Sequence, residues 1–179
     1  MAKRFKLKEG DIFTIPLEKN EVGIGQIISF PRHQHNFIMI VFDKKFKSIE
    51  SIDLSEINSY KILLLGYTVD AKLYHKDWAI IDNITENLSK ISLPYFKLGL
   101  PNDDYPDGAR LVDYKGNVLA NINRDIFDRL MFQTEVGPIR FEKALKAHFG
   151  LQEWISEDYD KILYEKTLES VKIAEEILK

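Results

Sequence analysis

Short apolar runs separated by polar turns fill the first two thirds of the chain, and this pattern predicts strands. Each run is rich in Ile, Val, Phe, Tyr or Leu and ends at residues that favour turns. The predicted strands cover residues 11–17, 22–30, 37–42, 61–69, 78–82, 95–100, 110–114 and 118–122. Lys115-Gly116-Asn117 separates the last two strands, which predicts a tight hairpin.

Details within these runs predict how the strands pack. Gly23 and Gly25 lie two apart in one predicted strand and so share a face, which indicates a bulge, strong curvature or a closely packed backbone. Residues 37–42 are almost continuously apolar, which predicts a central strand covered on both faces. Residues 43–48 are charged, and we expect them to be exposed.

The pattern changes to helical spacing after residue 122. Asn123 is a natural cap for a first helix, and Pro138 suits the first turn of a second helix that ends at Gly150. Ser156 predicts the start of the last and longest helix, through residue 178. One stripe of that helix contains Leu163, Thr167, Val171, Ala174 and Leu178.

Strands that precede helices predict an α+β fold rather than alternating parallel units. We expect a strongly bent antiparallel β-sheet or partial barrel, with an SH3-like arrangement as one form of it, followed by C-terminal helices. The predicted domains are a mainly β domain over residues 1–122 and a helical extension over residues 123–179 that packs on the same domain.

Composition removes several classes of function. The 179-residue chain has no cysteine, which excludes disulfides, thiolate metal sites and cysteine nucleophiles. Its net charge of −3 weighs against a sequence-independent nucleic-acid binder. The basic start lacks the apolar core of a signal peptide, and the run at residues 37–42 is too short to span a bilayer. We therefore expect a cytoplasmic protein with no membrane partner.

Two local clusters offer candidate chemistry. His33 and His35 face the same way in an extended segment and can share a metal, but a site needs a third ligand, so the favoured interpretation is two solvated loop histidines. Residues 101–108 form a loop with several aspartates. It fails the EF-hand pattern because Tyr105 and Tyr114 occupy ligand positions, which leaves a solvated turn or a partner contact. The candidate partner-binding residues are Asp103, Asp104, Tyr105 and Asp107.

No set of catalytic residues emerges from the motifs. The chain has no glycine–x–serine–x–glycine, phosphate-binding loop or dinucleotide fingerprint, so we expect no enzyme and no cofactor or metal. Trp78 is expected in the core or half-buried. A basic start that alternates with apolar residues is either a nucleic-acid arm or an amphipathic lead-in to the first strand. Its basic residues are Lys3, Arg4, Lys6 and Lys8.

One set of motifs resembles a known family. Gly-Asp-Ile-Phe-Thr-Ile-Pro-Leu at 10–17, Gly-Ile-Gly-Gln-Ile-Ile at 23–28 and Ile-Val-Phe-Asp at 40–43 are similar to the opening of the bacterial immunity protein 26 family. Trp-Ala-Ile-Ile at 78–81 resembles the family's tryptophan-containing segment. Asp82-Asn83 follows where the family pattern suggests glycine–histidine. The resemblance covers about residues 8 to 100.

This resemblance implies an immunity protein of a polymorphic toxin system, which binds a cognate toxin in the cytoplasm and blocks it without catalysis. Two alternatives stay open. A nucleic-acid-binding module on a bent sheet would use the basic start of the chain. A small hydrolase would hold a metal at His33 and His35.

Overall fold

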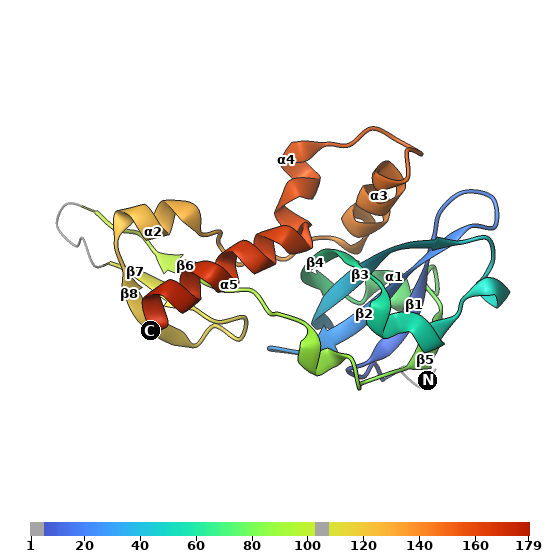
Figure 1. The fold of residues 1–179 in the computed structure, drawn as a ribbon, viewed down its shortest axis with the longest axis horizontal. Coiled ribbons are helices and arrows are strands. Elements are labelled where there is room, and N and C mark those ends of the chain that lie inside the picture. The colour runs from blue at the N-terminus through green and yellow to red at the C-terminus, as the bar shows by residue number, and fades with distance from the viewer. Residues whose placement is uncertain (1–5, 103–107) are drawn as a thin grey trace. The chain divides into compact units, whose positions relative to one another are not determined.

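The computed structural model describes residues 6–102 and 108–179. The chain forms two compact units, each made of two segments: unit 1 holds residues 1–90 and 135–164, and unit 2 holds residues 91–134 and 165–179. Figure 1 labels the elements along the chain. The division at residue 122 that the sequence suggests stays a prediction.

Unit 1 is built on a five-stranded antiparallel sheet with the strand order β4-β3-β2-β1-β5. Its strands are β1 (Asp11–Pro16), β2 (Val22–Ser29), β3 (Asn36–Phe46), β4 (Ile62–Val69) and β5 (Ile80–Asn83). Its α-helices are α1 (Ala71–Tyr74), α3 (Pro138–His148) and α4 (Ser156–Tyr159). Short 3-10 helices cover Ile49–Ser51, Leu54–Ser59, Leu88–Lys90 and Asp160–Ile162.

Antiparallel strands followed by helices confirm the predicted α+β class. The described strands form an open sheet with β4 and β5 at its edges, rather than the expected strongly bent sheet or partial barrel. The outer edge of β4 is occupied by the chain itself, because Leu163 bridges to Leu64 and Glu135 bridges to Tyr67. A barrel would close by pairing the outer edge of β4 with another strand of the sheet, and the segments at Leu163 and Glu135 already occupy that edge.

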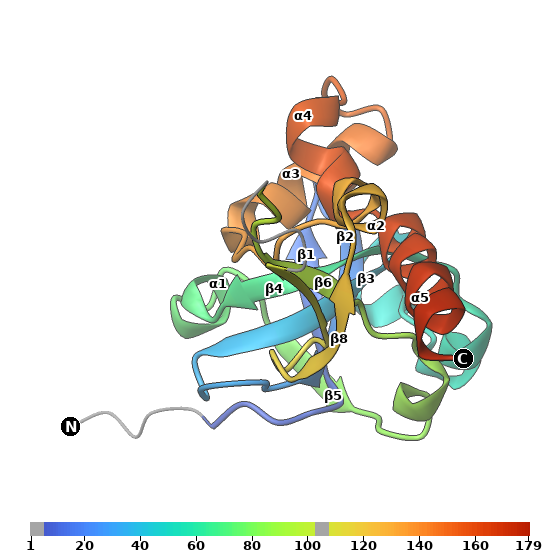
Figure 2. The same ribbon diagram turned by 90° about the vertical axis from the view of Figure 1, so that its left-hand side faces the viewer.

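The core of unit 1 lies between the sheet and α3. Phe141, Ala144 and Leu145 of α3 are fully buried in the same apolar cluster as Phe13 and Met39. Figure 2 shows α3 above the strands of this sheet. Residues 37–42 are all buried, which agrees with the predicted central strand.

The two glycines of β2 leave room for apolar side chains. The pairing of β2 with β3 shifts between Gly23 and Gly25, which agrees with a bulge, one of the three features expected there. A Cβ on Gly25 would lie 2.6 Å from the ring of Phe13, and a Cβ on Gly23 would lie 2.3 Å from a methyl carbon of Leu145. Both positions therefore exclude larger residues because the core already fills the space.

Two boundaries differ from the sequence-based expectation by more than two residues. Strand β3 continues to Phe46, four residues beyond the predicted end at residue 42. Lys45 pairs with Gly23 of β2 across the sheet, and Phe46 is buried. Lys44 and Lys45 are exposed, as expected, but strand pairing continues along their backbone.

The predicted last helix is wrong in its first part. The structure has α4, then a 3-10 turn, then an extended Leu163, and only then α5 (Tyr164–Leu178). Ser156 is the first residue of α4, and the capping position is Ile155, which makes no side-chain cap bond. The helix breaks at Leu163 because that residue bridges to Leu64 of β4.

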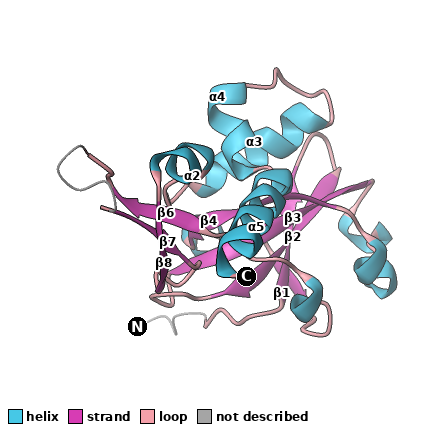
Figure 3. Cartoon of the chain, turned by 60° about the vertical axis from the view of Figure 1, so that its left-hand side comes forward, coloured by secondary structure: helices cyan, strands magenta, loops and turns pink. Residues whose placement is uncertain are grey.

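Unit 2 contains a three-stranded antiparallel sheet with the order β6-β7-β8. Its elements are β6 (Phe96–Gly99), β7 (Ala109–Val112), β8 (Val118–Ile122), α2 (Arg124–Arg129) and most of α5. Figure 3 shows the three strands side by side. Leu111, Ile122, Phe127 and Ile173 bring one face of the sheet together with both helices in a single apolar cluster.

Local signals in unit 2 agree with the sequence. The side chain of Asn123 accepts a hydrogen bond from the Ile126 N–H at 3.0 Å, which confirms the predicted cap of α2. The turn between β7 and β8 contains Gly116 with a positive φ of 87°, which confirms the hairpin. Within the described part of the chain, no helix combines the length and apolar character that crossing a membrane requires.

Candidate functional site

The residues predicted to contact a partner, Asp103, Asp104, Tyr105 and Asp107, lie outside the described residues. The basic start is described only from Lys6 onward, so Lys3 and Arg4 also lie outside. Lys6 and Lys8 are both exposed.

The histidine pair is not brought into a metal-binding arrangement. His33 is exposed, and the Nδ1 of His35 lies 2.8 Å from Oδ2 of Asp70, which ties the β2–β3 connection to the end of β4. Over residues 6–102 and 108–179, no group of three or more His, Cys, Asp or Glu side chains is placed to hold a metal ion. His35 is therefore engaged in a local contact.

Trp78 lies at the centre of a buried contact between β1, α1 and α3. Its ring stacks on Phe13 with 5.1 Å between centroids, and its Nε1 donates to Oε2 of Glu142 at 3.3 Å. Only 2% of Trp78 is exposed, which confirms its predicted place in the core. The indole therefore packs the sheet against α3 and also satisfies a buried carboxylate.

The Glu142 carboxylate is also held by two lysines. Lys146 Nζ lies 2.8 Å from its Oε1, and Lys72 Nζ lies 3.7 Å from its Oε2. The hydrogen bond from Lys72 to Asp77 raises the pKa of Lys72, as does the negative charge of Glu142. The Glu142 carboxylate is buried and already bonded to these donors. It therefore holds α3 to its neighbours and is not a free general base.

The Gly-Asp motif at the start of β1 closes a turn. Gly10 has a φ of 88°, and a Cβ there would lie 2.6 Å from the carbonyl oxygen of Ile84. Asp11 accepts hydrogen bonds from the Lys8 N–H and from Nδ2 of Asn83, both at 2.8 Å. Asn83, which departs from the family pattern, thus contacts the aspartate of the motif directly. These bonds hold β5 and the start of β1 together.

The glutamine of the Gly-x-Gly-Gln motif makes a buried amide pair. Gln26 Nε2 donates to Oδ1 of Asn87 at 3.1 Å and to the Ile84 carbonyl at 2.7 Å. Asn87 Nδ2 donates back to Oε1 of Gln26 at 2.7 Å. Gln26 is fully buried, so this pair anchors the segment after β5 to the middle of the sheet.

Comparison with known proteins gives the same family as the motifs. A family model described as Immunity protein 26 matches residues 8–103, which is more than half of the chain. The chain belongs to the immunity protein 26 family. Neither the comparison with curated proteins nor the comparison with solved structures finds a match.

The family motifs of this immunity protein 26 member build its scaffold. Gly10, Gly25, Gln26 and Trp78 are all buried, and each one fixes a turn, a bulge or a packing contact in unit 1. Buried residues do not reach a partner. The partner-specific contacts are therefore expected on exposed residues that the motifs do not contain.

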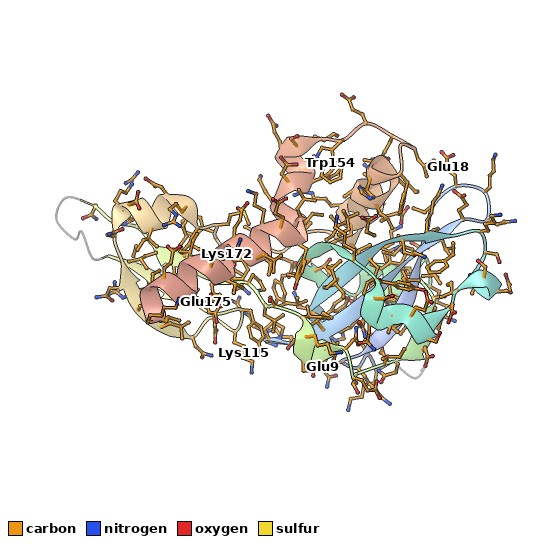
Figure 4. All side chains as sticks on the ribbon, viewed as in Figure 1. Glu9, Glu18, Lys115, Trp154, Lys172 and Glu175 are labelled. Carbon is orange, nitrogen blue, oxygen red and sulfur yellow. The ribbon has the colours of Figure 1, made fainter. Side chains whose placement is uncertain are left out.

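Sequence reasoning missed one exposed feature of this family member. Strand β8 lies at the edge of the small sheet, and Val118 and Leu119 within it are 57% and 39% exposed. Figure 4 labels Lys115 in the turn that precedes β8. The signal in the sequence is the uncharged run at residues 118–122, since strands at an open sheet edge usually carry a charge or a proline.

The turn before β8 is held by a carboxylate. Oδ1 of Asp113 accepts from the N–H groups of Lys115 and Asn117, both at 2.9 Å. Burial alone would raise the pKa of Asp113, but the hydrogen bonds from the Asn117 side chain and the turn backbone lower it overall. The turn therefore favours the ionised aspartate and fixes the position at which β8 begins.

Proposed function

We propose that this protein is a cytoplasmic immunity protein that binds a cognate bacterial toxin domain and neutralises it by occlusion, without catalysis. The observation that supports this proposal is the family match over residues 8–103. The partner is a protein, because immunity in this family implies a cognate toxin.

The build of unit 1 supports neutralisation by a preformed surface. Occlusion needs a scaffold whose backbone changes little when a partner binds. The central strands are buried, and the polar side chains inside the unit are paired, as in the Gln26–Asn87 and Trp78–Glu142 contacts. Within the described residues, no buried side-chain nitrogen or oxygen lacks a hydrogen-bond partner.

The acidic loop stays a proposed contact. Asp103, Asp104 and Asp107 would attract a basic toxin surface, and Tyr105 would supply an aromatic anchor. We expect replacement of all four by Ser to slow association with the toxin more than it speeds dissociation, because rim charges act mainly on the association rate. Surface plasmon resonance at low and high salt measures both rates.

Co-expression with the toxin encoded by the neighbouring gene tests the proposed function. Cells that produce the toxin should grow when this protein is present, and the two proteins should elute as one complex in size-exclusion chromatography. A toxin from an unrelated gene pair is the control, against which we expect no protection. Growth arrest and separate elution with the neighbouring toxin would contradict the proposal.

A further inference from the structure

Strand β8 presents an unpaired backbone edge. It pairs with β7 on one side, and among residues 6–102 and 108–179 no segment pairs with its other side. Alternate N–H and C=O groups along a strand point to opposite sides, so part of the β8 backbone points away from β7. Such groups are satisfied only by water or by another extended chain.

Each of the other three edges of the described sheets is either bridged by the chain or formed by a shorter strand with a polar end. The edge of β4 is bridged by Leu163 and Glu135, and the edge of β6 is covered where the Lys97 N–H donates to the Met131 carbonyl. Strand β5 is shorter and ends in the polar pair Asp82-Asn83. By comparison, the outer side of β8 is unpaired along its whole length by any residue that the structure describes.

The residues of β8 do not protect this edge. Proteins usually defend an exposed edge with charges, proline or an inward-pointing lysine. The sequence Val-Leu-Ala-Asn-Ile at 118–122 contains none of these. Val118 is 57% exposed and Leu119 is 39% exposed, so the strand offers apolar side chains beside its free backbone groups.

We propose that β8 binds an extended, uncharged, apolar strand of the cognate toxin, which adds to the β6-β7-β8 sheet as a fourth strand. This inference rests on the proposed function. Backbone hydrogen bonds would supply affinity, and contacts with Val118 and Leu119 would supply specificity. An uncharged strand fits because β8 has no charge with which to pair a charged one.

Two observations favour a toxin strand over a second copy of this chain. First, β8 lies outside residues 8–103, which the family model matches. Contacts to one particular partner are expected at positions that the shared family pattern does not cover. Second, a dimer made only by pairing a five-residue strand would bury far less than the roughly 800 Å² per partner of a standard interface. A toxin can add contacts beyond the strand.

A matched pair of variants tests the proposal against the toxin of the neighbouring gene. Leu119→Lys puts a charge on the edge strand, while Leu168→Lys puts the same charge on α5 at a residue with the same 39% exposure. We expect Leu119→Lys to weaken toxin binding about tenfold or more, and Leu168→Lys to change it less than about twofold. Circular dichroism checks that both variants fold.

Hydrogen exchange measures the backbone pairing directly. Amides of β8 that point away from β7 should exchange fast in the free protein and slowly in the complex, while amides of β5 should not change. If wild-type protein binds the toxin but β8 gains no protection and both variants bind equally, the β8 proposal is wrong and the proposed function stands. If wild-type protein binds no neighbouring toxin, both are wrong. A wild-type dimer that Leu119→Lys disrupts would identify a second copy as the occupant and overturn the toxin strand.

Discussion

Among the described residues, the two sheets of this protein differ at the edge that no later segment bridges. The five-stranded sheet is bridged along β4 at Leu163 and Glu135, its other edge strand β5 ends in polar residues, and most of its family-motif residues are buried. The three-stranded sheet leaves β8 unpaired among the described residues and exposes apolar side chains on it. The first sheet is built as a scaffold, and the second has the features of a surface that accepts a partner.

This difference separates two kinds of information in the sequence. Motif residues such as Gly10, Gln26 and Trp78 identify the family because the scaffold needs them at fixed positions. A shared scaffold cannot by itself select one toxin among many, so selectivity must come from exposed positions. Variants in the scaffold should change stability, whereas variants on β8 should change binding.

The strongest test of the scaffold is Trp78→Ala. Removing a large, buried, stacked ring leaves a cavity and should lower the free energy of unfolding by about 3–5 kcal/mol. Urea denaturation followed by the fluorescence of Trp154, the remaining tryptophan and also in unit 1, measures this loss. Tyr74→Ala is the control, because Tyr74 is 62% exposed, and it should cost less than about 0.5 kcal/mol. Similar losses in both variants would contradict the assigned role of Trp78.

Leu111→Ala tests the apolar core of unit 2 in the same way. Leu111 is fully buried against Phe127 and Ile173, and its truncation should cost about 2–4 kcal/mol. Hydrogen exchange of α5 amides measures the loss because both tryptophans lie in unit 1. Leu98→Ala on the adjacent strand, where half of the side chain is exposed, should leave this exchange nearly unchanged. Equal acceleration in the two variants would mean that this cluster is not the core of unit 2.

Gln26→Leu tests whether the buried amide pair stabilises the scaffold. The substitution leaves the Asn87 amide without its partner, and an unsatisfied buried polar group costs about 1–3 kcal/mol. The double variant Gln26→Leu/Asn87→Leu removes both polar groups and should cost less than the sum of the two single variants. Urea denaturation of the three variants measures this coupling. Additive losses would show that the two amides do not act as a pair.

Local patterns in the sequence predicted most of the elements. The hairpin at Gly116 and the caps and breaks at Asn123 and Pro138 depend on neighbouring residues alone, and the structure confirms them. The run at residues 37–42 was also interpreted correctly, because burial on both faces leaves no polar alternation.

Features set by distant contacts could not be predicted in the same way. The helix breaks at Leu163 because that residue bridges to Leu64, ninety-nine positions earlier in the chain, and helical spacing alone does not reveal such a contact. The open edge of β8 is likewise a property of sheet order rather than of the strand's own residues. The start of the last helix and the open edge of β8 therefore both depend on how distant segments pair, which the local sequence pattern does not show.

The smallest expected effect concerns the turn that positions β8. Asp113→Ala removes the acceptor for the Lys115 and Asn117 N–H groups and should cost about 1 kcal/mol, because each lost bond leaves a backbone group that water can reach. Lys115→Ala keeps the N–H and should have almost no effect. Faster exchange of the amides at residues 115–119 in the first variant alone measures this difference.

The pH dependence of the same turn gives a second measurement. The hydrogen bonds lower the folded-state pKa of Asp113 below its ordinary value of 3.8, so their stabilising contribution is complete well above pH 3.8 and is lost as the pH falls through the folded-state pKa. Wild type and Asp113→Ala should therefore differ in turn protection at pH 7 and converge in acid. A difference that persists unchanged at the lowest pH at which the protein stays folded would mean that the ionised carboxylate does not hold the turn. In that case the pairing of β8 with β7 would fix the residue at which β8 begins, and the position of the β8 edge would not depend on Asp113.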